Sequence, residues 1–376
     1  MGVLGPEFLL MLTLGQWTSA RASVKELTEM GHRDWTIVHG FYADMGGFVL
    51  HGPGIEIPFP IDAQQFLFLV KHGYIEYPRI TKEDIMDRNK SDGLARCIAV
   101  CQAVWMVIDC FTRVGLGLTL TKLELTTLSF ILVFLVTSFC WYYKPQDVTT
   151  TVPIHCVVHI DQILAENGIH GINPWHTSPL DFVHDEAFFC ERFWRYYMEI
   201  LSKVHLSIFS RKVDTRPYNR IPSDRFQSLD RLAEVIGAPV IVGFGCIFMF
   251  AWNFNFPSPT EQLLWRAASI YTLVYTFFGS ACAQYCHKIL LPRWSKQRAP
   301  LPIAQRDNLP AILRNIHPSK DPRLDIPLRA LIPVSVLCAL YCVCRGYILV
   351  EDFVGLRSLP ATAFQTVEWS DYVPHW

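Results

Sequence analysis

Charged residues are scarce in this chain. They make up 18% of its 376 residues, whereas apolar residues make up 51%. Three stretches contain no Asp, Glu, Lys or Arg at all: 125–143, 235–260 and 267–286. A helix needs about 20 residues to cross the ~30 Å hydrocarbon layer of a bilayer. The composition therefore excludes an ordinary soluble domain and predicts an integral membrane protein.

Several signatures of specific chemistry are also missing from the sequence. The net charge is only −1 and no Lys/Arg-rich block is interleaved with aromatic residues, so we expect no nucleic-acid partner. There is no Cys-x-x-Cys pair, which argues against zinc binding or thiol redox chemistry. Paired Asp-rich motifs for Mg²⁺, phosphate-binding Gly-rich loops and a Ser nucleophile elbow are absent as well. We therefore predict no metal and no cofactor.

One histidine pattern is the alternative to a metal-free site. His155 and His159 have the HxxxH spacing that di-iron membrane hydroxylases and desaturases use, and His176, Asp181 and His184 follow. Those enzymes also carry an HxxHH motif, which this sequence lacks. The 13 histidines are scattered along the chain, so we interpret this pair as unrelated to metal binding.

The apolar pattern predicts an all-α, polytopic transmembrane bundle of about six spans. The expected helices cover residues 1–20, 94–116, 121–143, 236–256, 263–290 and 326–349. The first could be read as a signal peptide, because Ala20-Arg21-Ala22 resembles a cleavage site. No basic residue precedes its apolar run, however, and Glu7 lies in it, so we favour an uncleaved helix.

These helices predict a single membrane domain, 1–376, with two compact hairpins. The hairpins are 94–143 and 236–290, and the last helix and tail cover 326–376. Three long polar regions separate them: 21–93, which is cytoplasmic or re-entrant, 144–235 and 291–325. With this order, the tight turns lie on one side of the membrane and the long regions on the other.

The basic loop after the second hairpin predicts the orientation. From Lys288 to Arg329 the chain has nine Lys/Arg and three Asp, and the positive-inside rule assigns such a loop to the cytoplasm. All three long regions are then cytoplasmic. Aromatic and apolar residues at helical spacing within 144–235 predict amphipathic helices that cap the bundle on this side.

Ionisable residues in or beside the helices are the candidate functional residues, because a charge in lipid is costly unless it faces a partner, water or a reaction site. Asp109 and Arg113 lie four residues apart on one polar face of a predicted helix. Glu124 follows the next tight turn, and Arg345 lies near the end of the last helix. We predict that they converge, together with Arg266 and Glu351-Asp352, in the half of the bundle opposite the long regions.

Two interpretations of this cluster remain open. An apolar environment raises the pKa of a carboxyl group and a cationic neighbour lowers it again, so the cluster could hold an acid able to protonate an epoxide or an olefin. It could equally be a set of structural ion pairs. Asp44 is a further candidate acid. Its segment is either a re-entrant turn that brings Asp44 to the mouth of the bundle, or the end of a helix that Gly46-Gly47 terminates. Glu7 is either a pocket acid or an N-terminal helix charge.

Six segments, spread over nearly the whole chain, carry a resemblance to a known family. They are Trp35–Phe48, Ile80–Asp92, Thr121–Thr126, Trp141–Val148, Val350–Pro360 and Val367–His375. They resemble a large fungal family of multi-pass membrane proteins that includes the integral-membrane terpene cyclases of meroterpenoid pathways, such as those making ascofuranone and macrophorins. The resemblance implies an endoplasmic reticulum protein that cyclises a prenylated aromatic or polyketide-derived substrate without a metal.

We therefore predict a terpene cyclase whose partners are a prenylated small molecule and membrane lipid. In it Asp109 and Glu124 are the acids, Arg113 and Arg345 adjust their protonation, and Asp44 is the third candidate acid. One rival function is a transporter or channel for a lipophilic or acidic solute, in which the same charges line a path. Broken helices in two matching halves would favour that rival, and the sequence shows no such symmetry. The other rival is a non-enzymatic membrane scaffold.

Overall fold

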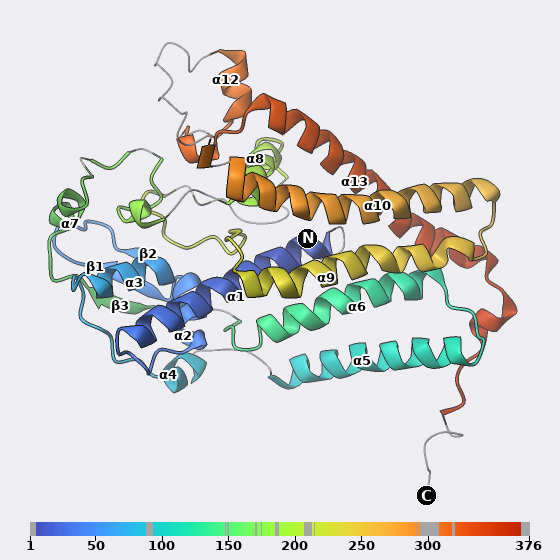
Figure 1. Ribbon diagram of the computed structural model, residues 1–376. Helices are drawn as coiled ribbons and strands as arrows, with labels where there is room; N and C mark the ends of the chain where they lie inside the picture. The colour runs from blue at the N-terminus through green and yellow to red at the C-terminus, as the bar shows by residue number, and fades with distance from the viewer. Residues whose placement is uncertain are drawn as a thin grey trace, which may run out of the picture.

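The computed structural model describes residues 5–87, 93–146, 148, 150–169, 171–173, 175–184, 188–206, 213, 215–290, 292–293, 308–317 and 320–369. It is mostly helical, with 66% helix and 4% strand. Long helices lie side by side and form the body of the molecule (Figure 1). They are α1 Pro6–Glu29, α5 Gly93–Gly115, α6 Lys122–Cys140, α9 Arg231–Ile247, α10 Pro259–Tyr285 and α13 Leu328–Val354. Helix α6 packs against α1, α5 and α9, and α10 packs against α9 and α13.

Four of these helices are long and apolar enough to cross a membrane. They cover 93–115, 122–140, 231–253 and 328–358, where the last two include the short 3₁₀ helices η2 Phe248–Asn253 and η6 Gly355–Ser358. Helices α1 and α10 occupy the places of the other two predicted spans but do not belong to this set. Both carry charges, for example Arg21 and Glu26 in α1 and Arg266 in α10. The four apolar helices support the prediction of a membrane protein.

Helix boundaries follow local capping signals. Helix α6 begins after Thr121, whose hydroxyl accepts the Glu124 N–H at 3.2 Å while the Glu124 carboxylate accepts the Thr121 N–H at 2.7 Å. Helix α9 begins after Asp230, whose carboxylate accepts the N–H of Ala233 at 2.8 Å. Gly117, with φ +73°, allows the tight turn between α5 and α6. The tight turns lie at one end of the bundle in Figure 1, as predicted.

The opposite end of the bundle carries a small sheet that corrects the all-α prediction. Strand β1 Phe48–His51 lies between β2 Phe59–Ile61, with which it is antiparallel, and β3 Val152–His155, with which it is parallel. These strands are only three or four residues long, and β3 lies about 100 residues after β1 in sequence. A pattern of alternating residues is not recognisable over such lengths. The sheet joins the two regions that we had treated as separate loops.

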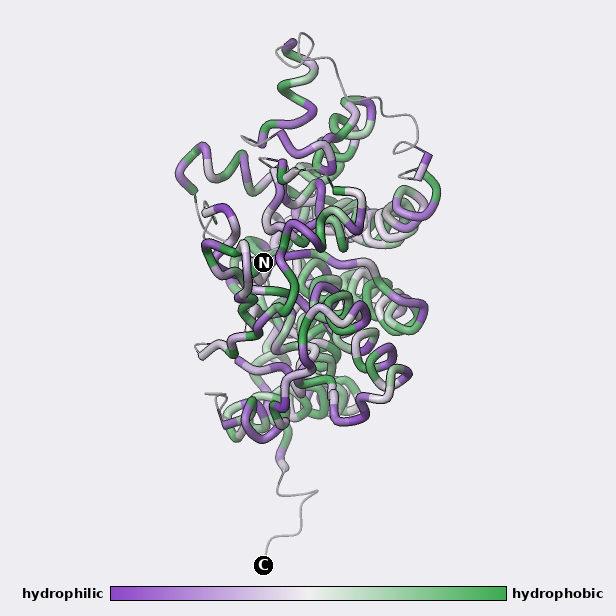
Figure 2. Tube along the Cα trace, turned by 90° about the vertical axis from the view of Figure 1, so that its left-hand side faces the viewer, coloured by the Kyte–Doolittle hydropathy of each residue, from purple (hydrophilic) through white to green (hydrophobic). Residues whose placement is uncertain are grey.

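Short helices pack around this sheet and form what we call the cap. They are α2 Ile37–Asp44, α3 Ala63–Lys71, α4 Lys82–Asp87 and α7 Ile160–Glu166. The rings of Trp35, Phe48 and Phe66 stack in the core of the cap, with 4.5 Å between the centroids of Trp35 and Phe66. Figure 2 views the molecule from this end and shows hydrophilic stretches among the segments that face the viewer.

Helix α8 Phe189–Lys203 is amphipathic, as predicted for the region 144–235. It buries Phe189 and Phe193 against Leu331 of α13. Two short helices lie within the predicted region 291–325. They are α12 Leu309–Arg314 and the 3₁₀ helix η5 Pro322–Leu324. Much of that region, including 294–307, lies outside the described residues. All three long polar regions therefore contain helices or strands among their described residues.

A close contact between α1 and α2 determines where Asp44 lies. A Cβ atom on Gly40 would lie 2.8 Å from the Cα and 2.9 Å from the carbonyl oxygen of Ala20, so only glycine lets the two helices approach this closely. Helix α2 then ends at Asp44, because Gly46 takes the left-handed conformation with φ +81°. The structure thus shows the helix end that one of our two interpretations of this segment predicts.

Candidate functional site

Arg113 and Glu124 meet at the turn between α5 and α6, as the sequence predicts. Their side chains form an ion pair, and Arg113 also donates to the carbonyl oxygens of Thr119 and Ala363, each at 3.0 Å. The second carboxylate oxygen of Glu124 accepts from the backbone and hydroxyl of Thr121. Both oxygens of Glu124 are thus engaged in a helix cap and an ion pair, an arrangement that suits the structural interpretation.

Asp109 and Arg345 do not join this pair. Asp109 is half-buried on α5, which lies at the edge of the bundle against α6 (Figure 1), and it makes no hydrogen bond or ion pair with a described residue. Arg345 is fully buried among the rings of Phe130, Phe244 and Phe248. Of the four candidate residues, only Arg113 and Glu124 therefore form an ion pair with each other.

A second ion pair, which we did not predict, lies near that turn. Lys122 donates to Glu351 at 2.7 Å, and the side chains are only 4% and 3% exposed. The next residue, Asp352, accepts the Thr126 hydroxyl at 3.1 Å. The sequence contained a signal for this pair, because Lys122 begins one apolar helix and Glu351-Asp352 ends another. Charged residues do gather at this end of the bundle, although mostly as closed pairs.

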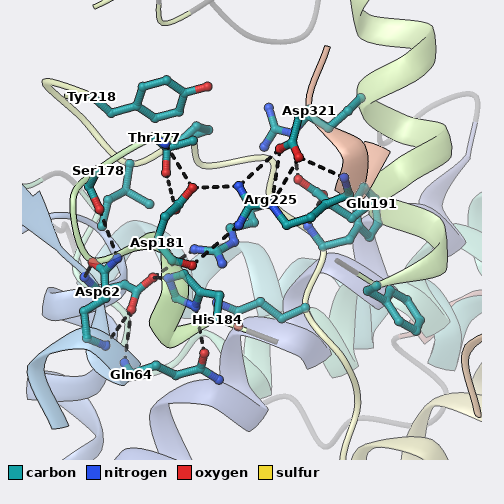
Figure 3. A pocket seen from close by; sticks show the side chains of 18 of the residues that line it. Asp62, Gln64, Thr177, Ser178, Asp181, His184, Glu191, Tyr218, Arg225 and Asp321 are labelled. Carbon is teal, nitrogen blue, oxygen red and sulfur yellow. Dashed lines mark hydrogen bonds and ion pairs between the residues drawn. The ribbon is translucent and has the colours of Figure 1, made fainter. Parts of the chain in front are cut away.

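Asp44 lies at the other end and lines a cavity of about 240 Å³. The cavity is bounded by α1, α3, α8, the segments 175–184, 216–228 and 321–324, and His317 (Figure 3). Its acidic residues are Asp44, Asp62, Asp181, Glu191 and Asp321, and its arginines are Arg195, Arg216, Arg225 and Arg323. Aromatic side chains complete the wall: Trp175, Phe188, Tyr218 and Phe226.

Asp62 is held in place by a dense set of hydrogen bonds. It is the N-cap of α3, where Oδ1 accepts from the backbone N–H groups of Gln64 and Gln65. Its Oδ2 pairs with His184 Nε2 at 2.8 Å and with Arg225 at 2.9 Å. His184 Nδ1 in turn lies 2.9 Å from Gln64 Oε1, so both ring nitrogens face oxygen acceptors (Figure 3). This geometry fixes the His184 ring between Asp62 and Gln64.

Asp44 has fewer hydrogen-bond partners than Asp62. Its Oδ1 accepts the backbone N–H of Ala63 at 3.1 Å, whereas Oδ2 is shielded from solvent and has no hydrogen-bond partner among the described residues. The Ser19 hydroxyl lies close to this carboxyl without forming a hydrogen bond of normal geometry. Asp44 thus lines the cavity and has one carboxyl oxygen without a partner among the described residues.

The pKa values of Asp44 and Asp62 are shifted in opposite directions. Burial, followed by the negative charge of Asp62, raises the pKa of Asp44 to about 7. Burial would also raise the pKa of Asp62, but the charge and hydrogen bond of His184, with Arg225, outweigh it and hold that pKa well below its ordinary value. Near neutral pH the cavity thus contains an ionised Asp62 and an Asp44 that can still carry a proton. Such divergent pairs are typical of acid–base sites.

The remaining acids of the cavity are neutralised by arginines. Arg323 pairs with Asp181 at 2.6 Å and with Asp321 at 3.1 Å, and Arg195 pairs with Glu191 at 2.6 Å. The charge of Arg323 and the hydrogen bonds of Thr177 hold the pKa of Asp181 below its ordinary value although burial opposes them. Of the four cavity arginines, Arg216 alone has no carboxylate partner among the described residues and stacks on Tyr218 instead.

Most of this site was not predicted from the sequence. Asp44 was the third candidate acid, and Asp181 and His184 were considered only as possible metal ligands. The histidines of the HxxxH pattern lie elsewhere: His155 belongs to β3 and His159 caps α7. Asp62 could have been recognised as a helix N-cap from Asp62-Ala-Gln-Gln65. Its partners His184 and Arg225 are more than 120 residues away, so no local pattern connects them.

Replacing Asp62 by Asn is expected to lower the pKa of Asp44. The substitution removes the negative neighbour that helps to raise this pKa and leaves His184 and Arg225 without their counter-charge, and Asn still caps α3. In the unchanged protein the infrared band of the protonated Asp44 carboxyl should disappear around pH 7. In the variant it should disappear at lower pH. Asp44→Asn assigns the band, and an unchanged midpoint in Asp62→Asn would contradict the coupling.

Comparison with known proteins identifies a family. Residues 16–166 and 227–376 match a family of unknown function (DUF8562). No curated protein and no solved structure is similar to the chain. The matched segments contain Asp44, Asp62 and the bundle helices except the first ten residues of α1, whereas His184, Arg216 and Arg225 lie in the segment between them. The chain therefore belongs to this family of unknown function, DUF8562.

Proposed function

We propose that this chain is a multi-pass membrane enzyme that cyclises a prenylated aromatic or polyketide-derived substrate, with Asp44 as the proton donor. The observation that supports this most directly is that Asp44 lines the cavity, has one carboxyl oxygen without a partner among the described residues, and has a pKa of about 7 beside the ionised Asp62. Asp44 takes this role in place of Asp109 and Glu124. Both oxygens of Glu124 are engaged, and Asp109 lies on the edge helix.

The proposed reaction is an isomerisation. The proton of Asp44 passes to the oxygen of a terminal epoxide, or to a carbon of an olefin, and in the epoxide the carbon–oxygen bond breaks. The carbocation is then attacked by the electron pair of the next olefin, which forms the ring bond. Loss of a proton from the last cation back to the Asp44 carboxylate restores the acid. A trigger of this kind needs no metal.

The cavity wall suits such an intermediate. Trp175, Phe188 and Phe226 present aromatic rings to the cavity, and aromatic faces stabilise cations. Arg216, which lacks a carboxylate partner among the described residues, can bind the oxygens of a phenolate or carboxylate head group. An amphipathic substrate would then place its head at Arg216 and its prenyl tail along the aromatic wall.

The same proposal includes the arrangement in the membrane. Helices α1 and α10 are the fifth and sixth spans, because α1 packs against α6 and α9 and α10 packs between α9 and α13. The basic loop assigns the cap to the cytoplasmic side of the endoplasmic reticulum. The cavity lies at this side, between bundle and cap, where a prenylated molecule dissolved in the bilayer can enter.

The test is the conversion of an epoxidised farnesyl-phenol by host membranes that contain the full chain. We expect a product of unchanged mass and new retention time in chromatography with mass detection. Membranes without the chain are the control. If the compound stays unconverted but accumulates inside vesicles that contain the chain, the transporter is correct and the enzyme proposal is wrong. If neither occurs with this substrate class, the proposal also fails.

A further inference from the structure

Arg345 is completely buried in the bundle, and its guanidinium has no hydrogen-bond partner among the residues that the structure describes. Its exposure is 0%, and Nε, Nη1 and Nη2 all lack an acceptor within the described part of the chain. The centroids of the Phe130, Phe244 and Phe248 rings lie 5.6, 5.0 and 4.8 Å from its central carbon. These rings stabilise the positive charge. They satisfy none of the five N–H donors of the side chain.

Two buried carboxyl groups near Arg345 each have an unused oxygen. Glu7, in the first turn of α1, accepts the hydroxyl of Tyr341 through Oε1, but Oε2 has no partner in the described structure. Asp352 accepts the Thr126 hydroxyl through Oδ1, and Oδ2 likewise has none there. Tyr341, Arg345 and Asp352 follow each other at intervals of four and seven residues, so they share one face of α13. Over these 11 residues the helix rises roughly 16 Å.

Glu7, Arg345 and Asp352 form a polar row in which hydrogen-bond donors and acceptors both lack partners among the described residues. Buried polar atoms are costly without a partner, most of all a charge in a membrane bundle. A group that completes the row must accept from the guanidinium and donate to a carboxyl. A hydroxyl does both, whereas a simple anion cannot donate and a simple cation cannot accept. The neighbouring side chains, including Leu10, Phe244 and Ile348, are apolar.

We propose that Arg345, Glu7 and Asp352 form a binding site inside the bundle for the hydroxyl group of a lipophilic alcohol or phenol. The polar head lies between the guanidinium and one of the carboxyls, and the hydrocarbon part lies against the aromatic rings. This site is separate from the cavity at Asp44, because the buried Leu10, Leu12 and Leu14 of α1 lie along the helix between Glu7 and Ser19. It does not depend on the proposed cyclisation.

The experiment uses the purified full chain in lipid nanodiscs and a 12-carbon alcohol with a diazirine beside the hydroxyl. After illumination, we expect labelled peptides from α9 and α13. Unlabelled dodecanol should compete for the label, and dodecyl methyl ether, which cannot donate a hydrogen bond, should compete roughly 10-fold less well or worse. Arg345→Met should lower the labelling of these peptides by roughly 10-fold or more. Glu7→Gln and Asp352→Asn test the acceptors.

Two matched variants show that the effect is local. Arg266→Met removes a cation of α10 that stacks on Trp252, and Asp44→Asn alters the cavity; both should leave the labelling of α9 and α13 unchanged. Equal competition by alcohol and ether in the unchanged protein would overturn the proposal and assign the row to water alone. That comparison needs no variant, so it holds even if Arg345→Met does not fold. Because the cyclisation assay follows a different product, either proposal can fail while the other stands.

Discussion

Replacing Asp44 by Asn is expected to lower the rate of isomer formation by roughly 10²- to 10⁴-fold, the usual contribution of a general acid. Asparagine fills the same space and can still accept the Ala63 N–H that Asp44 Oδ1 accepts at 3.1 Å. It cannot donate a proton of comparable acidity. The measurement is the initial rate of product formation in membranes with matched amounts of protein.

The pH dependence of the unchanged enzyme gives this prediction a second readout. Burial and Asp62 raise the pKa of Asp44 to about 7, so the acid form predominates below that pH and is lost as pH rises through it. The rate should therefore fall on the alkaline side of pH 7. Asp161→Asn is the matched control, because the Asp161 side chain is 79% exposed on α7. A variant at Asp44 that keeps both the rate and the pH profile would contradict its role as the acid.

The helices could be predicted from the sequence because their signals are local. The uncharged stretch 125–143 became α6 Lys122–Cys140, and the capping residues Thr121 and Glu124 lie three positions apart. The ion pair between Arg113 and Glu124 was predictable for the same reason, since a short turn leaves the two side chains few other positions. Local patterns of this kind are the most reliable sequence signals.

The cavity could not be predicted in the same way. In the cavity, Asp62 from the polar region 21–93 forms ion pairs with His184 and Arg225 from the polar region 144–235. Nothing in the sequence indicates that β1 pairs with β3, about 100 residues later, and brings those regions together. We also expected the functional acids to be among the charged residues of the apolar helices, because a charge in a membrane helix costs free energy unless it has a function. The structure shows that Arg113 and Glu124, and likewise Lys122 and Glu351, neutralise each other there.

The pair of Lys122 and Glu351 leads to the largest expected effect on stability. Replacing Glu351 by Leu should lower the free energy of unfolding by about 3–5 kcal/mol, because it leaves a buried charge without its partner. Lys122 is only 4% exposed. Its ammonium lies over the Phe256 ring, 4.1 Å from the centroid, and packs against Gly355, so it has little room to reach water.

Two further variants separate the loss of the ion pair from the loss of packing. Replacing both partners, Lys122→Met with Glu351→Leu, should recover most of the stability, since apolar side chains of similar volume can replace a buried pair at little cost. Arg357→Met breaks the ion pair between Arg357 and Glu261. The two side chains of this pair are 56% and 21% exposed, so its loss should lower the free energy of unfolding by about 0–1 kcal/mol. Unfolding of each variant is followed by denaturant titration of the purified chain in detergent. If Glu351→Leu costs no more than Arg357→Met, Lys122 reaches water in the folded protein. The end of the bundle opposite the cap would then be open, and the charges there would again be candidates for a solute path.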